Sequence, residues 1–238
     1  MNLLFIHGAG GSKDKWRAVA PYFKGCDADF IDLPGHGDSA EGLCHSIEEM
    51  AVWLQDKIKA NTIVVGHAMG GLVALALAAR EPQIKGVVLA SSFYELPVAE
   101  DVWQSLSARG CPDRVFDAAY AKSACTALLA QERAAWQATA PEVWAADLQV
   151  CAEHRSGKQD LASLKVPVLA ISGAEDRLLP ENAAVALSHA YCPTENHILF
   201  GVGHHAILEA PLACAQAIQT FAQCTRQKLK NQEKRVCC

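Results

Sequence analysis

The sequence has no apolar run long enough to cross a membrane. None of its apolar stretches within 238 residues approaches the length of about 20 residues that a transmembrane helix needs. Position 1 leads directly into the run Leu3-Leu4-Phe5-Ile6, so a charged leader, a long apolar segment and a small-residue cleavage site are also lacking. We therefore expect a cytoplasmic protein without a membrane partner.

The sequence also has no large excess of charge of either sign. The formal net charge is −5 at pH 7, and the one strongly basic stretch is the tail at residues 225–238. Binding to a nucleic-acid backbone needs a basic face on the folded domain. We expect no nucleic-acid partner and interpret the tail as the solvated end of the last helix.

Cysteine is too sparse for a disulfide scaffold, with 10 residues in a chain long enough to build a core without bridges. The cysteines and histidines also lack the spacing of metal ligands, and Cys237 and Cys238 are adjacent. We expect buried free thiols, no metal and no cofactor.

Short apolar runs alternate with longer amphipathic stretches, which is typical of βαβ units. The pattern predicts an α/β fold with a mainly parallel sheet of about six strands flanked by helices. We expect strands at 2–6, 28–32, 61–65, 85–90, 166–172 and 195–200, and helices at about 14–23, 46–59, 69–80, 181–190 and 206–223.

The alternation stops between Glu95 and Asp160, where no strand-like run occurs and large apolar residues follow helical spacing. So long a stretch is rarely a structureless loop. We predict an α/β core at 1–94 and 161–224, a helical cap at 95–160 and a basic tail at 225–238. The cap would lie over the carboxyl ends of the strands, where open α/β sheets bind ligands.

The segment Gly66-His67-Ala68-Met69-Gly70-Gly71 follows the apolar run that ends at Val65 and precedes a helix-forming stretch. Strand, tight turn and helix in this order form a nucleophile elbow of the pattern Gly-x-Ser-x-Gly. Alanine occupies the position of the serine, and its methyl group cannot attack a substrate. The pattern predicts a catalytic scaffold that lacks its nucleophile at Ala68.

Acyl transfer also needs donors for the developing oxyanion. The turn His7-Gly8-Ala9-Gly10-Gly11 follows the first predicted strand, and its glycines expose backbone N–H groups. We predict an oxyanion hole formed by the N–H groups of Ala9 and of Met69, the residue after the elbow. The turn is not a phosphate loop, because the pattern Gly-x-x-x-x-Gly-Lys-Ser is missing.

An acid and a base follow the last two predicted strands. Asp176 is the candidate acid and its neighbour Glu175 the less favoured one. His204 is the candidate base, with the adjacent His205 as the runner-up. The order nucleophile, acid, histidine along the chain is the one used by hydrolases with such an elbow.

From Leu3 to about Phe221 the chain resembles the α/β-hydrolase superfamily, in the group of small esterases and lactonases with a helical cap. The matching segments are His7-Gly8-Ala9-Gly10-Gly11, Asp32-Leu33-Pro34-Gly35-His36-Gly37-Asp38-Ser39, the elbow, Gly173-Ala174-Glu175-Asp176-Arg177, Gly203-His204 and Glu209-Ala210-Pro211. The resemblance implies a serine at position 68, a triad in which Asp176 orients His204, and a cap over the acyl pocket. The chain departs from the group in lacking the leading β-hairpin and in having Ala68.

Three interpretations of Ala68 are open. An inactive variant made to capture a substrate would keep the acid, the histidine and the oxyanion turn, as this chain does. A natural pseudoenzyme would bind a small molecule. A lyase would use His204 as a base on bound substrate. The first predicts a serine hydrolase acting on a carboxylic ester, inactivated here at position 68.

The substrate is predicted only as a class, and its binding residues are not predicted. Three tryptophans in the cap favour a small ester with an apolar acyl or aryl group. An ester linked to a carrier protein, as in the pimeloyl-carrier methyl ester esterases, is the alternative. The excess of acids over bases between Glu95 and Asp160 disfavours an acidic carrier on the cap.

Overall fold

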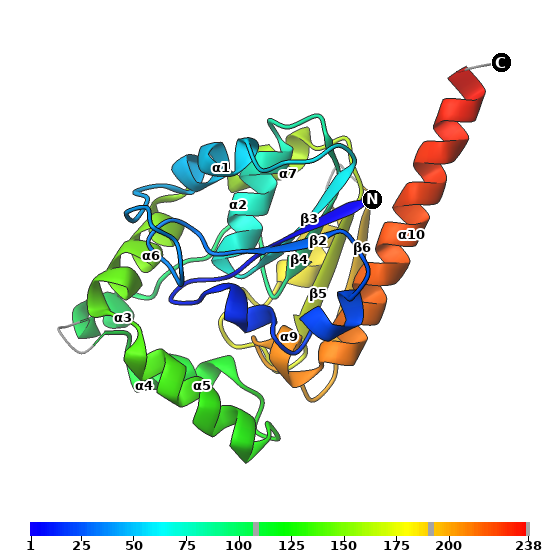
Figure 1. Cartoon of the computed structure of the whole chain (residues 1–238). Helices are drawn as coiled ribbons and strands as arrows, with labels where there is room; N and C mark the ends of the chain where they lie inside the picture. The colour runs from blue at the N-terminus through cyan, green and yellow to red at the C-terminus, as the bar shows by residue number, and fades with distance from the viewer. Residues whose placement is uncertain (107–109, 190–192, 237–238) are drawn as a thin grey trace.

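A six-stranded, all-parallel sheet in the order β2-β1-β3-β4-β5-β6 forms the centre of the molecule (Figure 1). The computed structural model describes residues 1–106, 110–189 and 193–236. The strands are β1 (Asn2–Ile6), β2 (Ala28–Ile31), β3 (Thr62–His67), β4 (Ile84–Ala90), β5 (Val168–Gly173) and β6 (Thr194–Leu199). All six predicted strands are present, with bounds that differ by at most two residues. The predicted α/β fold with a parallel sheet is confirmed.

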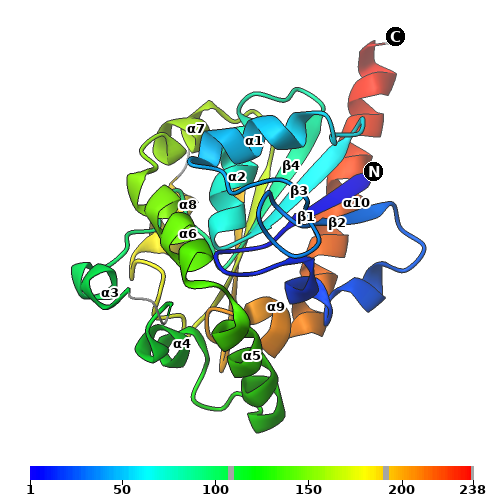
Figure 2. The same cartoon turned by 60° about the vertical axis from the view of Figure 1, so that its left-hand side comes forward.

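Helices cover both faces of the sheet (Figure 2). One face carries α1 (Ile47–Gln55), α2 (Met69–Ala78), α7 (Gly157–Ser163) and α8 (Ala183–Ser188); the other carries the 3₁₀ turns η1 (Lys13–Trp16) and η2 (Ala20–Phe23) with α9 (Ala206–Glu209) and α10 (Pro211–Val236). Successive strand side chains point to opposite faces, so Leu4 packs in the first cluster and Phe5 in the second. The sheet is therefore buried on both sides.

Two helices that were predicted to be continuous are each divided into two elements. The helix expected at 14–23 is the pair of 3₁₀ turns η1 and η2, because Pro21 has no N–H to continue a helical ladder. The helix expected at 206–223 is divided into α9 and α10, because Pro211 forces Ala210 out of the helical region.

The last helix continues through residues 225–236, in line with the interpretation of the basic tail as the end of this helix. α10 runs to Val236 and projects beyond the body of the molecule (Figures 1 and 2). Thr225 is still buried, whereas Arg226, Lys228 and Lys230 are exposed. Across the described residues, no helix combines the length and the apolar character that a membrane span requires.

Between β4 and α7 lie α3 (Glu100–Ser105), α4 (Asp113–Ala119), α5 (Thr126–Ala138) and α6 (Pro141–Glu153). They gather at the end of the sheet where the strands terminate (Figure 1). We call α3 to α6 the cap helices. The division into core, cap and tail remains a prediction.

The cysteines at 26, 44, 111, 125, 151, 214 and 224 are free. The expectation of buried thiols holds for Cys111, Cys151 and Cys214. It is wrong for Cys26, Cys125 and Cys224, which are exposed, and Cys44 is half-buried. The remaining cysteines, at 192, 237 and 238, lie outside the described residues.

Two glycines allow β3 and α2 to meet in the tight turn at position 68. A Cβ atom at Gly66 would lie 2.1 Å from the Gly70 carbonyl oxygen, and one at Gly70 would lie 2.4 Å from the Ile6 carbonyl oxygen. Both obstacles are backbone atoms that cannot rotate away. Both positions therefore require glycine.

The Gly66→Ala variant is expected to lose about 4 kcal/mol or more of its free energy of unfolding, because the added methyl group must push β3 and α2 apart. Urea denaturation followed by circular dichroism measures the loss. Gly42→Ala is the matched control, since a Cβ atom there meets nothing within 4 Å. Equal stability of the two variants would contradict the close approach.

Candidate functional site

Ala68 lies at the tip of the turn between β3 and α2 in a strained conformation. Its backbone has φ 48° and ψ −117°, a region that residues other than glycine rarely adopt. Such strain is typical of functional turns. Met69 is the first residue of α2, so its N–H has no partner within the helix. The turn thus presents the Ala68 side chain and the Met69 N–H together.

Asp176 and His204 are brought together from the loops after β5 and β6. His204 Nδ1 lies 2.9 Å from Asp176 Oδ2 and 3.1 Å from Oδ1. The carboxylate also accepts hydrogen bonds from the N–H groups of Leu178 at 3.0 Å and Leu179 at 3.2 Å. Because Nδ1 faces a carboxylate, it carries the proton and leaves the lone pair on Nε2.

The pKa of Asp176 is lowered in this position. Burial by itself raises it, but the charge and hydrogen bond of His204, together with the backbone N–H groups, outweigh that effect. Asp176 is therefore an ionised group that can stabilise a protonated His204.

Neither of the two less favoured residues takes the place of Asp176 or His204, although His205 also lines the cavity beside Ala68. Glu175 accepts a hydrogen bond from the backbone N–H of Lys122 at 3.1 Å, away from the histidines. The His205 ring stacks between His67 and Tyr120, with ring centroids 5.1 and 4.7 Å away, and its Nδ1 has no hydrogen-bond partner in the part of the chain that the structure describes. Among the described contacts, the Asp176 carboxylate reaches His204 and not His205.

One cavity of about 250 Å³ joins the predicted residues. Ala9, Ala68, Met69 and His204 all line it. Most of its remaining wall is apolar and comes from the cap and from the segment after β4: Leu96, Val98, Val102, Val115, Trp136, Trp144 and Leu148. Asp176 lies behind His204, outside the lining. Among the described residues, no group of His, Cys, Asp or Glu is arranged to hold a metal ion.

Three other histidines of this region are held neutral by burial. Burial and the nearby His204 lower the pKa of His67 to about 3, and burial with His36 lowers that of His7 to about 4. Burial and then Lys15 lower the pKa of His205 well below its usual value. Neutral rings beside the cavity can accept or donate hydrogen bonds without adding charge.

These three histidines predict a loss of stability in acid. Below about pH 6.5 the unfolded chain binds protons at His7, His67 and His205 that the folded chain does not, so stability falls as pH falls. Each can contribute up to about 1.4 kcal/mol per pH unit, and the three together about 5 kcal/mol between pH 6.5 and 5. Urea denaturation at pH 7 and pH 5 measures the loss.

The His205→Phe variant separates this effect from general acid sensitivity. It removes one of the three groups, and its stability should fall about one third less between pH 7 and 5 than that of the parent. His45→Gln, at an exposed position, is the control and should behave as the parent does. A parent stability that is equal at both pH values would contradict the account.

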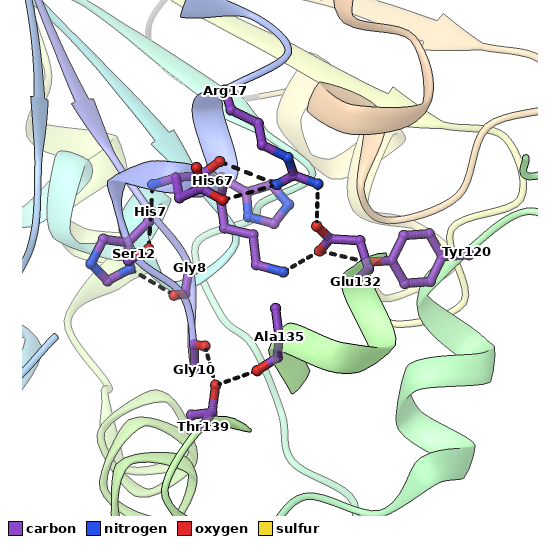
Figure 3. Close-up of polar contacts among 12 residues, drawn as sticks. His7, Gly8, Gly10, Ser12, Arg17, His67, Tyr120, Glu132, Ala135 and Thr139 are labelled. Atoms are coloured by element: carbon purple, nitrogen blue, oxygen red, sulfur yellow. Dashed lines mark hydrogen bonds and ion pairs between the residues drawn. The ribbon is translucent and has the colours of Figure 1, made fainter. Parts of the chain in front are cut away.

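Glu132 on α5 is a buried acid of the cap that sequence reasoning did not predict. Its carboxylate binds Lys15 Nζ, lies 2.5 Å from an Arg17 nitrogen and accepts a hydrogen bond from the Tyr120 hydroxyl at 3.0 Å (Figure 3). Burial raises its pKa, but Lys15 and Arg17 outweigh burial and lower it. Glu132 thus ties α5 to η1 by a buried ion pair.

Asp147 on α6 is a second acid that the sequence did not single out. Its Oδ2 lies 2.9 Å from His36 Nε2 and accepts a hydrogen bond from the Gly10 N–H at 2.7 Å. A single acid on an amphipathic helix carries no recognisable spacing signal. The turn from Asp32 to Ser39 contains His36, and only the fold reveals that this turn meets the cap.

Comparison with known proteins relates this arrangement to esterases. The sequence profile described as "Alpha/beta hydrolase family" matches residues 3–217. The pimeloyl-[acyl-carrier protein] methyl ester esterase of Yersinia enterocolitica is 27% identical over 93% of this chain and 93% of its own length. The 2-succinyl-6-hydroxy-2,4-cyclohexadiene-1-carboxylate synthase of Salmonella arizonae is 28% identical over 94% and 93%.

Solved structures share the fold. A structure described as that of a thermophilic esterase superposes with a TM-score of 0.78 at 25% identity, covering 94% of this chain and 90% of the other.

Two bifunctional biotin biosynthesis proteins, from Teredinibacter turnerae and Cellvibrio japonicus, also match in sequence, but the chain spans only 18% and 47% of their lengths.

Proposed function

The chain belongs to the alpha/beta hydrolase family, and on that premise we propose that it is built as a carboxylic ester hydrolase of the acyl-enzyme type. With alanine at position 68 it binds an ester and does not hydrolyse it. The observation that carries the proposal is the 2.9 Å contact between His204 and Asp176, made beside the cavity that Ala68 lines.

Each residue has one role in the proposed reaction. A serine in place of Ala68 attacks the ester carbonyl carbon, and His204 Nε2 takes the hydroxyl proton. Asp176 orients the ring and stabilises the resulting imidazolium. The N–H groups of Ala9 and Met69 bind the oxyanion. His204 then gives its proton to the leaving alcohol, and water attacks the acyl-enzyme by the same steps in reverse order.

The shape and lining of the cavity favour a small ester with an apolar acyl or aryl group. Trp136, Trp144 and Leu148 form much of the cap side, and the cavity holds about 250 Å³. The third cap tryptophan, Trp103, does not line it. An ester attached to a carrier protein is the second candidate substrate, favoured by the match to the esterase of Y. enterocolitica.

A base-catalysed elimination is the second candidate reaction. One observation favours it: the chain has no nucleophile at Ala68. In that reaction His204 would remove a proton from bound substrate without an acyl-enzyme.

Hydrolysis of a panel of p-nitrophenyl and methyl esters, acetate through octanoate, tests the proposal. The chain as given and the Ala68→Ser variant are compared. Turnover in the variant alone supports an ester hydrolase, and the preferred acyl length measures the pocket. Inactivity of a folded Ala68→Ser variant on every ester would contradict it and favour the elimination or a binding protein.

A further inference from the structure

We propose that Asp147 is a positioning residue through which the cap sets the geometry of the oxyanion hole. The inference rests on the proposed function, because it concerns the turn that supplies the Ala9 N–H. In outline, Asp147 holds Gly10, and Gly10 fixes the two peptide groups on either side of it. The oxyanion donor is then correctly oriented only while α6 lies against the turn.

Gly10 is held by cap side chains at three points. Its N–H donates to Asp147 Oδ2 at 2.7 Å. Its carbonyl oxygen lies 3.0 Å from the Thr139 hydroxyl, whose hydrogen is shared with the Ala135 carbonyl (Figure 3). A Cβ atom at Gly10 would lie 2.4 Å from the Trp144 ring, so this ring packs directly on the glycine.

The hydrogen bonds of the turn pass this constraint to the Ala9 N–H. Asp147 fixes the Ala9–Gly10 peptide plane, and Thr139 contacts the Gly10–Gly11 plane. The N–H of that second plane belongs to Gly11 and donates to the Gly8 carbonyl at 3.1 Å. The Gly8 carbonyl and the Ala9 N–H belong to one rigid peptide group. Three consecutive peptide planes are therefore set, two of them by the cap.

The core contributes the remaining contact to this peptide group. His7 Nδ1 lies 2.9 Å from the Gly8 carbonyl oxygen (Figure 3). His7 Nε2 accepts a hydrogen bond from the Leu33 N–H at 3.1 Å. His7 is thus a neutral ring with its proton on Nδ1. It holds the Gly8 carbonyl from the core, whereas Asp147 acts on the turn from the cap.

Asp147 is itself fixed by a charged partner. His36 Nδ1 lies 2.9 Å from the Pro34 carbonyl oxygen and His36 Nε2 lies 2.9 Å from Asp147 Oδ2. Both ring nitrogens face acceptors, so His36 is an imidazolium. Both side chains are about 1% exposed, and a charge-assisted bond between buried groups has a well-defined geometry.

Kinetics of variants made in the Ala68→Ser background test the inference. Asp147→Ala should lower kcat by about 10²-fold, which is the lower range for loss of one oxyanion donor, with KM changed less than about threefold. Asp147→Asn should stay within about fivefold of the parent, because its amide oxygen can accept the Gly10 N–H. Asp113→Ala is the control, since that cap carboxylate pairs with Arg133 of the cap itself.

Amide hydrogen exchange in the chain as given supplies a second readout that needs no activity. Asp147→Ala should accelerate exchange at Gly10 and also at Gly11, whose N–H bonds Gly8, by about tenfold or more. If Ala68→Ser hydrolyses nothing, the proposed function fails, and exchange still decides whether Asp147 orders the turn.

Three results would overturn the inference. One is an unchanged exchange rate at Gly10 and Gly11 in folded Asp147→Ala. Another is an unchanged kcat in the active double variant. The third is an equal loss of kcat in Asp147→Ala and Asp113→Ala. If Asp147→Ala does not fold, Thr139→Val replaces it and should accelerate exchange at Gly11, whereas no acceleration there would count against the coupling.

Discussion

Ester turnover is expected to rise by about 10⁶-fold in the Ala68→Ser variant, which is the usual cost of a missing serine nucleophile. Serine differs from alanine by one oxygen, and the backbone at position 68 already adopts the strained φ of 48°. The new hydroxyl would therefore project into the cavity without rearrangement of β3 or α2. Burst and steady-state release of p-nitrophenol from the preferred ester measures the gain.

The Ala68→Gly variant is the matched control for this result. Glycine relieves the backbone strain at position 68 but supplies no nucleophile, so it should remain as inactive as the chain as given. Activity in Ala68→Gly, or equal activity in alanine and serine forms, would show that a different group performs the chemistry.

A second large effect is expected at His204 and Asp176 in the Ala68→Ser background. His204→Ala should lower kcat by about 10⁶-fold, since the serine then has no base. Asp176→Asn should lower it by about 10⁴-fold, because the amide no longer holds the ring with its proton on Nδ1. Adding Asp176→Asn to His204→Ala should cost little more, as the residues act as one unit.

Neighbouring residues serve as controls for these variants. Glu175→Gln and His205→Phe alter an acid and a ring that do not contact the His204–Asp176 pair through a hydrogen bond. Both should keep kcat within about tenfold. A loss of kcat in His205→Phe as large as that in His204→Ala would contradict the assignment of His204 as the base.

Local sequence patterns predicted the parts of the candidate site that each lie on one turn. The elbow around Ala68 and the loops with Asp176 and His204 each combine an apolar strand with turn residues, so both position and order are readable. The helix breaks at Pro21 and Pro211 could also have been predicted from the sequence, because proline disrupts a helix, but the expected helices were drawn through both residues.

The cap contacts could not be predicted in this way. Asp147 meets Gly10 across 137 positions of sequence, and Glu132 meets Lys15 across 117. Both acids lie on amphipathic helices, where an isolated carboxylate is normally solvent-exposed. Only the packing of α5 and α6 against the turn after β1 buries them.

Covalent labelling with an alkyl p-nitrophenyl phosphonate tests the central claim most directly, since it reports an activated nucleophile even when the natural ester is unknown. The Ala68→Ser variant should release one equivalent of p-nitrophenol and carry one phosphonate, located by peptide mass mapping at position 68. The chain as given should carry none. A folded Ala68→Ser variant that stays unlabelled, or a label at another residue, would contradict the account.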